Sequence, residues 1–453
     1  MKARETLKQA TRFRRIAISS AALAVASISL AAPVCAQGLI RDSEIEQLLN
    51  DYARPIFKVA GLGEGRVAMR IVKSDAFNAF VLDGRNVFIH TGALQQADTP
   101  NQVIGVIAHE AGHITGGHMA ALRARIARDT SRILLARVLG IGVAVATGNA
   151  AAAAAGDELI MRSLLAERRS QESAADQAGL SFLNKTNQSG RGMLETFERF
   201  AQQEYIGDQN KDPFVRSHPV ATERLAQLRD SVQKNPTFAI KDTPALQLRH
   251  DMMRAKLAGY LTRPQAVFNR YPVSDTSMPA RYARAIAKFF QGGPNSVEAA
   301  VGDLDQMIKE RPDNPYFHEL KGDIYKRAGR AKDAIGPLRQ ALKMAGDANL
   351  IRVELAQALL STNEPAVVDE ATTMLRRSLV EDQNASAYRA LSDAQYRQNK
   401  QPEAEASLAQ AAFLEGDIKQ AKIYAERAKR GIAAGSPSAL KMDDIISFKP
   451  PVE

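Results

Sequence analysis

The sequence predicts a mainly α-helical protein, with an α-rich domain that carries a small β-hairpin and a C-terminal solenoid of stacked helices. Three patterns support this fold class. Residues 102–108 are largely apolar and free of proline, which is typical of a buried helix. Residues 78–90 form two short apolar runs around Asp83-Gly84, which predicts a hairpin. Beyond Pro244, helical patterns recur at a nearly constant period, which indicates a repeat architecture.

The first 36 residues have the composition of a secretory signal peptide. Met1–Arg15 is rich in lysine and arginine, Ile16–Ala32 is apolar, and small residues lead to Ala36. We therefore expect export and cleavage after Ala36. A lipoprotein anchor at Cys35 is the alternative, but Ala32-Pro33-Val34 does not supply the leucine and small residues that lipidation needs.

Composition narrows the classes of function. Cys35 is the only cysteine, so the mature chain would have no disulfide and only His, Asp and Glu for metal binding. About half of the formal charge of +10 lies in the first 36 residues, and the chain has no tryptophan. Without a dense basic block, the sequence gives no support to nucleic-acid binding.

The segment His109-Glu110-Ala111-Gly112-His113 is an H-E-x-x-H motif. On a helix, residues i and i+4 share a face, so both imidazoles can bind one Zn²⁺. Glu110 beside them could take a proton from a metal-bound water. The motif predicts a zincin-type metallopeptidase domain, and the alternative is a chance occurrence in an ordinary amphipathic helix.

A third metal ligand has two candidates. His118 nearly completes the H-x-x-G-x-x-H pattern after His113, but Met119 holds the required place, so on a continuous helix His118 is a surface or supporting residue. Glu172 is the better candidate, because Asp176 shares its helix face and could accept a hydrogen bond from a ligating imidazole. For Glu172 the alternative is a solvated helix carboxylate.

Further elements are expected around this motif. Ser43–Ala60 has a helical pattern and Arg66–Val72 alternates as a strand. The hairpin strand that begins at Asn78, Ala79 and Phe80 could bind a peptide at its edge by strand addition, or it could be purely structural. Val138–Ala155 lacks charge but is rich in alanine and glycine, which favours a buried helix or a lid that touches the membrane over a span.

The C-terminal part contains a recurring triplet of small and apolar residues. Successive triplets are 34, 37 and 33 residues apart, which is typical of helix B of tetratricopeptide repeats, and Gly322 and Tyr325 fit helix A. The triplets are Ala300/Leu304/Met307, Ala334/Leu338/Ala341, Ala371/Leu375/Ser378 and Ala404/Leu408/Ala411. Such repeats bind polypeptides on a concave surface. The alternative is a helical bundle without repeats.

The order of a strand with Asn-Ala-Phe, H-E-x-x-H and a later E-x-x-A-D resembles the M48 family of zinc metallopeptidases. The resemblance implies one Zn²⁺ per chain on His109, His113 and Glu172, with Glu110 as general base. Asp176 would support the site.

The family resemblance extends to Ser217-His218-Pro219 and to Arg224. It implies that His218 can act as a regulatory fourth zinc ligand, which holds the enzyme inactive until it leaves, and that Arg224 supports the site. A departure is Leu82-Asp83-Gly84 in the hairpin, where many members have Pro-Gly-Gly. This departure affects how the edge strand would present a substrate and leaves the metal ligands unchanged.

The sequence resembles the family members that have both an export signal and tetratricopeptide repeats. This resemblance implies a periplasmic endopeptidase. Its expected substrates are misfolded or stalled envelope proteins, especially outer-membrane β-barrel precursors. Expected partners are the outer-membrane β-barrel assembly machinery, through the repeats, and the membrane surface. The alternative function is a chaperone or assembly scaffold with a latent protease site.

The expected domain boundaries follow from these motifs. They are a signal peptide at 1–36, a metallopeptidase domain at 37–238, a connecting helical segment at 239–275, a repeat domain at 276–435 and a tail at 436–453.

Overall fold

The computed structural model describes residues 38–450, apart from 64, 126–151, 202–212 and 219–221. The expected signal peptide and most of Val138–Ala155 lie outside the described residues. Among the helices that the structure does describe, none combines the length and hydropathy of a membrane span. The described part of the chain divides into two compact units, with the boundary between Met307 and Ile308.

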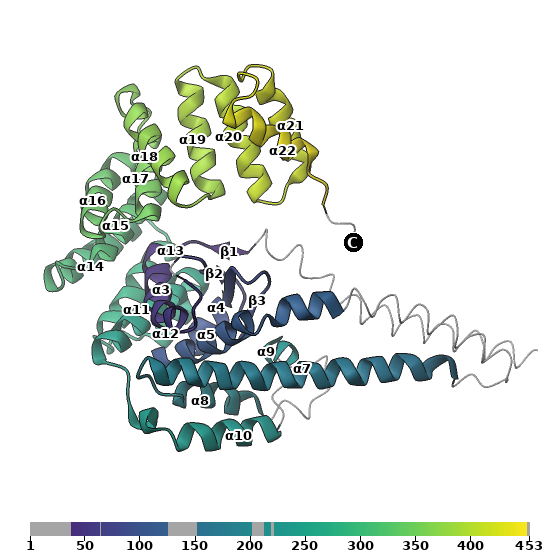
Figure 1. Ribbon diagram of the computed structural model, residues 1–453. Helices are drawn as coiled ribbons and strands as arrows, with labels where there is room; N and C mark the ends of the chain where they lie inside the picture. The colour runs from purple at the N-terminus through teal and green to yellow at the C-terminus, as the bar shows by residue number, and fades with distance from the viewer. Residues whose placement is uncertain (1–37, 64, 126–151, 202–212, 219–221, 451–453) are drawn as a thin grey trace, which may run out of the picture. The chain divides into compact units, whose positions relative to one another are not determined.

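The first unit is α-rich with a small sheet, as the sequence predicts (Figure 1). Its strands are β1 (Leu39–Ile40), β2 (Ala68–Val72), β3 (Ala79–Val81) and β4 (Asn86–His90). Its helices are α3 (Ser43–Val59), α4 (Thr91–Gln96), α5 (Pro100–Thr115), α7 (Ala152–Lys185), α8 (Arg191–Ala201), α9 (Pro213–Ser217), α10 (Thr222–Gln233), η3 (Pro236–Ala239), α11 (Pro244–Leu261), α12 (Pro264–Arg270), α13 (Met278–Gln291) and α14 (Ser296–Glu310).

The four strands lie in the order β1-β2-β4-β3, so β3 is an edge strand. β3 and β4 form the predicted antiparallel hairpin, with Phe80 opposite Phe88. The turn is stabilised by Asp83, whose Oδ1 accepts hydrogen bonds from the backbone N–H groups of Arg85 and Asn86, and by Gly84 at φ +72. β2 pairs with β4 in parallel.

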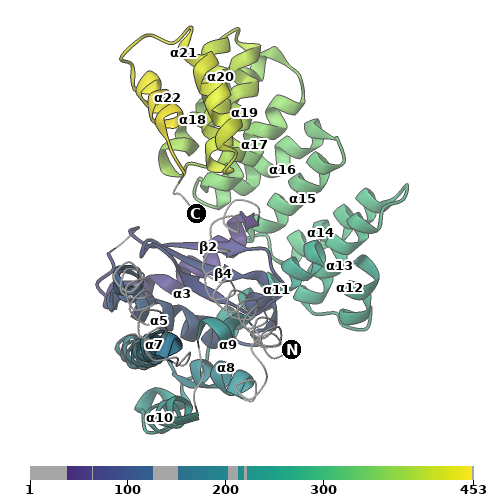
Figure 2. The same cartoon turned by 90° about the vertical axis from the view of Figure 1, so that its right-hand side faces the viewer.

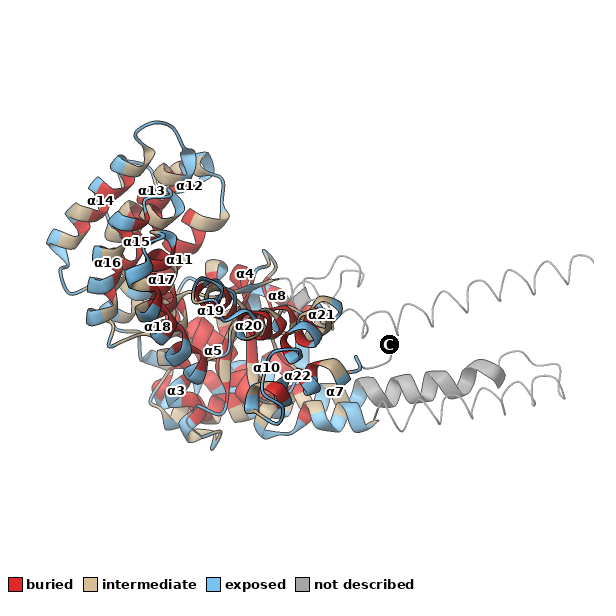
Figure 3. Ribbon diagram, turned by 90° about the horizontal axis from the view of Figure 1, so that it is seen from above, coloured by how far each residue is buried: buried red, intermediate tan, exposed pale blue. Residues whose placement is uncertain are grey.

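Helices α5 and α7 pack side by side next to the sheet (Figure 1). α5 is buried from Pro100 to His113, in accord with its apolar sequence and with the red colour of this helix in Figure 3. A Cβ atom on Gly112 would lie 2.6 Å from the carbonyl oxygen of Ala175. Glycine therefore allows the two helices to approach closely between His109 and His113.

The second unit consists of successive antiparallel helix pairs, seen in two orientations in Figures 1 and 2. Its elements are α15 (Pro315–Arg327), α16 (Ala331–Met344), α17 (Asn349–Ser361), η4 (Pro365–Val367), α18 (Val368–Glu381), α19 (Ala385–Arg397), α20 (Gln401–Leu414), α21 (Ile418–Lys429) and α22 (Pro437–Ser447). Each helix packs against the next. The structure thus confirms the mainly α fold class with a helical-repeat region.

The repeat triplets form the packed faces of their helices. Every triplet residue except the half-buried Leu408 is buried. Gly322 on α15 has the tight contact that a helix A glycine requires, because a Cβ atom there would lie 2.5 Å from Cγ of Leu338 on α16. The period in the sequence therefore arises from pairwise helix packing.

Candidate metal centre

His109 and His113 lie one turn apart at the C-terminal end of α5. Their Nε2 atoms are 3.0 Å apart and both side chains are buried. Burial and the nearby His109 lower the pKa of His113 to about 2. His113 is therefore neutral near pH 7, which is the form that binds a metal.

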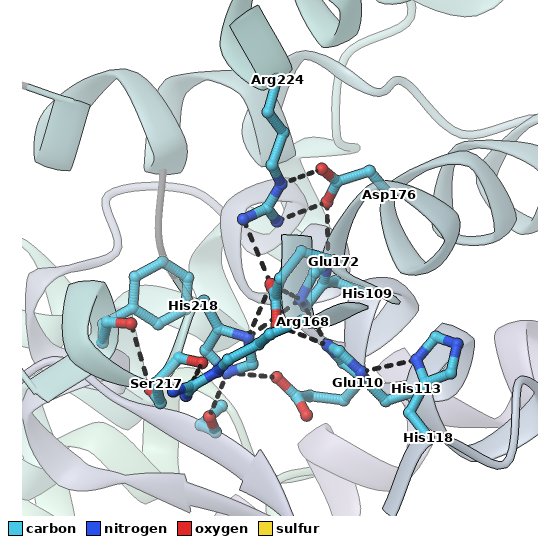
Figure 4. A network of polar contacts seen from close by, with 12 residues as sticks. His109, Glu110, His113, His118, Arg168, Glu172, Asp176, Ser217, His218 and Arg224 are labelled. Carbon is cyan, nitrogen blue, oxygen red and sulfur yellow. Dashed lines mark hydrogen bonds and ion pairs between the residues drawn. The ribbon is translucent and has the colours of Figure 1, made fainter. Parts of the chain in front are cut away.

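Glu172 and Asp176 lie one turn apart on α7 and face the two histidines (Figure 4). The Glu172 carboxylate lies 3.4 Å from Nε2 of both His109 and His113. Asp176 instead meets the opposite ring atom of His109, with 2.8 Å between Oδ1 and Nδ1. The two carboxylates therefore share one face of α7, as the sequence predicts, but they contact opposite nitrogen atoms of His109.

Arg224 on α10 is a buried cation that contacts Asp176 and Glu172. Its Nη2 donates to Asp176 Oδ1 at 2.8 Å, its Nε contacts Oδ2, and its Nη1 lies 3.1 Å from Glu172. The Arg224 guanidinium also lies over the ring of Phe197. Burial opposes ionisation of Asp176, but its hydrogen bonds with Arg224 and His109 hold the pKa of this carboxyl below the usual value.

His218 follows α9 and lies against the same cluster. Its Nδ1 is 3.1 Å from both His109 Nε2 and Glu172 Oε2. Its Nε2 is 3.2 Å from the carbonyl oxygen of Ala79 on the edge strand and 3.4 Å from Glu110 Oε1. One side chain therefore contacts the histidines, the acidic ligand candidate and β3.

Four residues offer atoms that converge on one point: His109, His113, Glu172 and His218. These ligand atoms lie within 4.8 Å of one another, and all four side chains are buried. Asp176 occupies Nδ1 of His109, so Nε2 can present its lone pair to the centre when that imidazole is neutral. Nitrogen and carboxylate donors in this number suit zinc.

The charges of the cluster also fit a divalent cation. Glu110, Glu172 and Asp176 are buried, and the buried Arg224 guanidinium contacts Glu172 and Asp176. With these carboxylates ionised, negative charge exceeds positive charge in a low-dielectric site, and a dication would offset the excess. Two hydrogen bonds to carboxylates outweigh burial and raise the pKa of His109 to about 9, so metal binding there would release a proton.

Glu110 points into the same region from α5 (Figure 4). Its Oε1 is buried and has no hydrogen-bond partner. Burial raises the pKa of the Glu110 carboxyl above its usual value. A carboxyl group with a raised pKa and an unsatisfied oxygen is suited to exchange a proton with a neighbouring water.

The edge-strand candidates lie beside this cluster. Ser217 Oγ donates to Asn78 Oδ1 at 3.1 Å, next to the contact of His218 with Ala79. Phe80 stacks on Phe88 across the hairpin, with ring centroids 5.2 Å apart. Of the three predicted residues, Asn78 and Ala79 therefore contact the segment of His218, and Phe80 packs on the sheet.

Arg168 has a contact that the sequence did not indicate, whereas His118 has the supporting position that the sequence left open beside a surface one. Arg168 on α7 donates from Nη2 to the backbone carbonyl of Ser217 at 2.7 Å. It lies one turn before Glu172, and this spacing could have identified it. His118 contacts His113, with 2.9 Å between the two Nδ1 atoms, because α5 ends at Thr115 and the chain turns back.

An HExxH helix packed against a second helix with a glutamate at the same centre defines the class of zinc-dependent metalloproteases. Residues 40–232 match the model of peptidase family M48. The match lies within this unit, and it confirms the resemblance of the sequence to that family.

Several proteins are similar to this chain over most or part of its length. The β-barrel assembly-enhancing protease of Escherichia coli K12 is 22% identical over 424 residues, which are 89% of this chain and 83% of that protein. The protein of the same name from Yersinia pestis is 23% identical over 422 residues, with the same two shares. Metalloprotease YcaL of E. coli K12 is 25% identical over 42% of this chain and 74% of its own length.

Proposed function

We propose that this chain is a periplasmic zinc endopeptidase that degrades misfolded or stalled envelope proteins and assists the assembly of outer-membrane β-barrel proteins. The convergence of His109, His113 and Glu172 on one point is the observation that carries the catalytic part. The names of the relatives from E. coli and Y. pestis support the part concerning β-barrel assembly.

In this proposal His109, His113 and Glu172 hold one zinc ion per chain. Bound zinc would supply a Lewis acid and a water of lowered pKa. Glu110 would accept a proton from the attacking water at its buried carboxylate and would donate it to the leaving amine as the peptide bond breaks. Asp176 holds Nδ1 of His109, and Arg224 keeps Asp176 in place.

The edge strand β3 supplies a place for the substrate backbone. A peptide that adds to β3 would use main-chain groups near Ala79, which makes binding largely independent of side-chain sequence. A protease for misfolded proteins needs such tolerance. The helical repeats would bind protein partners, with the β-barrel assembly machinery proposed as one of them.

His218 is proposed as a regulatory fourth ligand. Its Nδ1 lies 3.1 Å from atoms of His109 and Glu172, so it would occupy the ligand position that a catalytic water needs. Its segment also contacts Ala79, the first residue of β3, and the preceding Asn78. Activity would require this segment to move.

The variant Glu110→Gln tests the catalytic role. We expect it to bind zinc like the wild type and to lose at least about a hundredfold in peptide cleavage, because general-base catalysis contributes on this scale. The exposed Glu198, which pairs with Arg229, provides the control Glu198→Gln, with activity unchanged. Cleavage by Glu110→Gln at the wild-type rate would refute the assigned base.

A scaffold function of the helical repeats is the second candidate, because the repeat unit forms a compact body by itself. Complementation of a deletion strain separates the two. If Glu110→Gln restores every envelope phenotype while a chain without the repeats restores none, the scaffold function is favoured. The endopeptidase function predicts that Glu110→Gln fails.

A further inference from the structure

His118 lies against the second histidine of the metal centre. α5 ends at Thr115, Gly117 adopts φ +63, and helical residues resume at His118. The imidazoles of His113 and His118 have ring centroids 5.0 Å apart at an interplanar angle of 79°. Their Nδ1 atoms are 2.9 Å apart. The turn therefore brings a residue five positions later into contact with His113 (Figure 4).

The turn has space for this imidazole because residue 116 is glycine. A Cβ atom on Gly116 would lie 2.3 Å from Nε2 of His118 and 2.7 Å from Cδ2. The nearest atoms around that position all belong to the His118 ring. An alanine there would displace this ring before anything else. His118 itself is only 9% exposed.

The Nδ1–Nδ1 contact fixes the position of one proton. When His113 binds a metal through Nε2, its remaining proton must be on Nδ1. This N–H then donates to the Nδ1 lone pair of His118, whose own proton lies on Nε2. His118 thus accepts a hydrogen bond from Nδ1–H of His113, as Asp176 does from Nδ1–H of His109.

We propose that His118 is a positioning residue, which accepts the Nδ1–H hydrogen bond of His113 and thereby fixes the tautomer and ring orientation of this ligand. The inference rests on the proposed zinc site. It assigns no contact with substrate to His118. Loss of such an outer partner lowers metal affinity by about 10- to 100-fold in other sites.

The first test compares two substitutions by equilibrium zinc competition against a chelator. His118→Ala removes the acceptor and should weaken zinc binding about 10- to 100-fold. In His118→Asn the amide oxygen can take the place of Nδ1, so affinity should return to within about threefold of the wild type. Thermal unfolding of the metal-free variants serves as the folding control. Equal affinity of both variants would overturn the proposal, because the amide oxygen of asparagine would then contribute nothing as an acceptor.

The second test is a double-mutant cycle with Gly116. Gly116→Ala keeps both imidazoles but displaces His118, so it should lower zinc affinity by a factor similar to that of His118→Ala. In the His118→Ala background the added methyl group meets no ring, and Gly116→Ala should cost no further affinity. Additive losses would overturn the proposal.

The two proposals fail in distinguishable ways. A wild-type chain that binds no zinc refutes the proposed function and with it this inference. A wild-type chain that binds zinc while His118→Ala binds it equally well refutes only the role of His118.

Discussion

The Nδ1 atom of His109 lies 2.8 Å from Oδ1 of Asp176. Asp176 follows Glu172 by one helical turn on α7. A single helix therefore presents one carboxylate to the Nε2 side of His109 and another to its Nδ1 side. The second contact determines which nitrogen can face a metal ion.

Replacement of Asp176 by asparagine should weaken zinc binding. The Asp176 carboxylate accepts hydrogen bonds from both the Nδ1–H group of His109 and the Arg224 guanidinium, and the amide of asparagine cannot accept both in the same way. We expect a loss of about 10- to 100-fold in zinc affinity, measured by chelator competition. Asp230→Asn, at an exposed pair on α10, is the control. Unchanged affinity in Asp176→Asn would show that the contact does not orient His109.

Replacement of His218 by alanine should raise proteolysis. If His218 occupies the centre in most wild-type molecules, only the remaining fraction is active. Where that fraction is roughly one in ten, removal of the imidazole should raise the rate about tenfold. The rate of cleavage of an unfolded protein substrate measures this change, with His318→Ala in the repeat unit as the control. A rate equal to or below that of the wild type, at normal zinc content, argues against an inhibitory contact.

Replacement of Gly112 by alanine should disturb the approach of α5 and α7. The new methyl group would lie 2.6 Å from the backbone oxygen of Ala175, which can move only with its helix. We expect a loss of about 1–3 kcal/mol in stability together with weaker zinc binding. At Gly302 on α14 nothing lies within 4 Å of a Cβ atom, so Gly302→Ala should be neutral or stabilising. Equal thermal midpoints for the two variants would contradict the close packing.

Replacement of Lys256 by methionine should destabilise the first unit. Lys256 is buried on α11, 2.8 Å from Asp42 and 3.2 Å from Glu44 at the start of α3. Its removal leaves the buried Glu44 carboxylate without a neighbouring cation and should cost about 3–5 kcal/mol. Arg249→Gln breaks the exposed pair between the same two helices and should cost at most about 1 kcal/mol. Chemical denaturation of both variants measures the difference, and similar costs would contradict the assigned burial.

The loss in Lys256→Met should also depend on pH. Burial raises the pKa of Glu44, although Lys256 counteracts this. A carboxyl with a raised folded-state pKa binds more protons in the folded state, so stability falls as pH rises from the unfolded-state pKa through the raised one. Removal of Lys256 raises that pKa further. The deficit of the variant should therefore shrink as pH is lowered through this window, and a constant deficit would exclude Glu44 as its cause.

The sequence predicted the residues whose arrangement depends on helix periodicity. His109 and His113, and likewise Glu172 and Asp176, each share a face because four residues make about one turn. The repeat triplets were predictable because each helix B buries the same positions. The Asp83-Gly84 turn followed from local turn chemistry.

Other features depend on where helices end and on pairing between distant segments. On a continuous helix His118 would point away from His113, but the turn at Gly116-Gly117 reverses this. The parallel pairing of β2 with β4 joins strands between which β3 lies in the sequence, and no local pattern specifies it. The contact of Arg168 with Ser217 needs α7 and the end of α9 to be packed together.

Elemental analysis of the purified, unchelated chain tests the central claim most directly, in the wild type and in Glu172→Ala, with Glu198→Gln as the surface control. We predict one zinc ion per chain in the wild type and the control, and a large loss of zinc in Glu172→Ala together with its peptidase activity. A wild-type chain without stoichiometric metal, or Glu172→Ala with full zinc content, would contradict a metal site formed by α5 and α7.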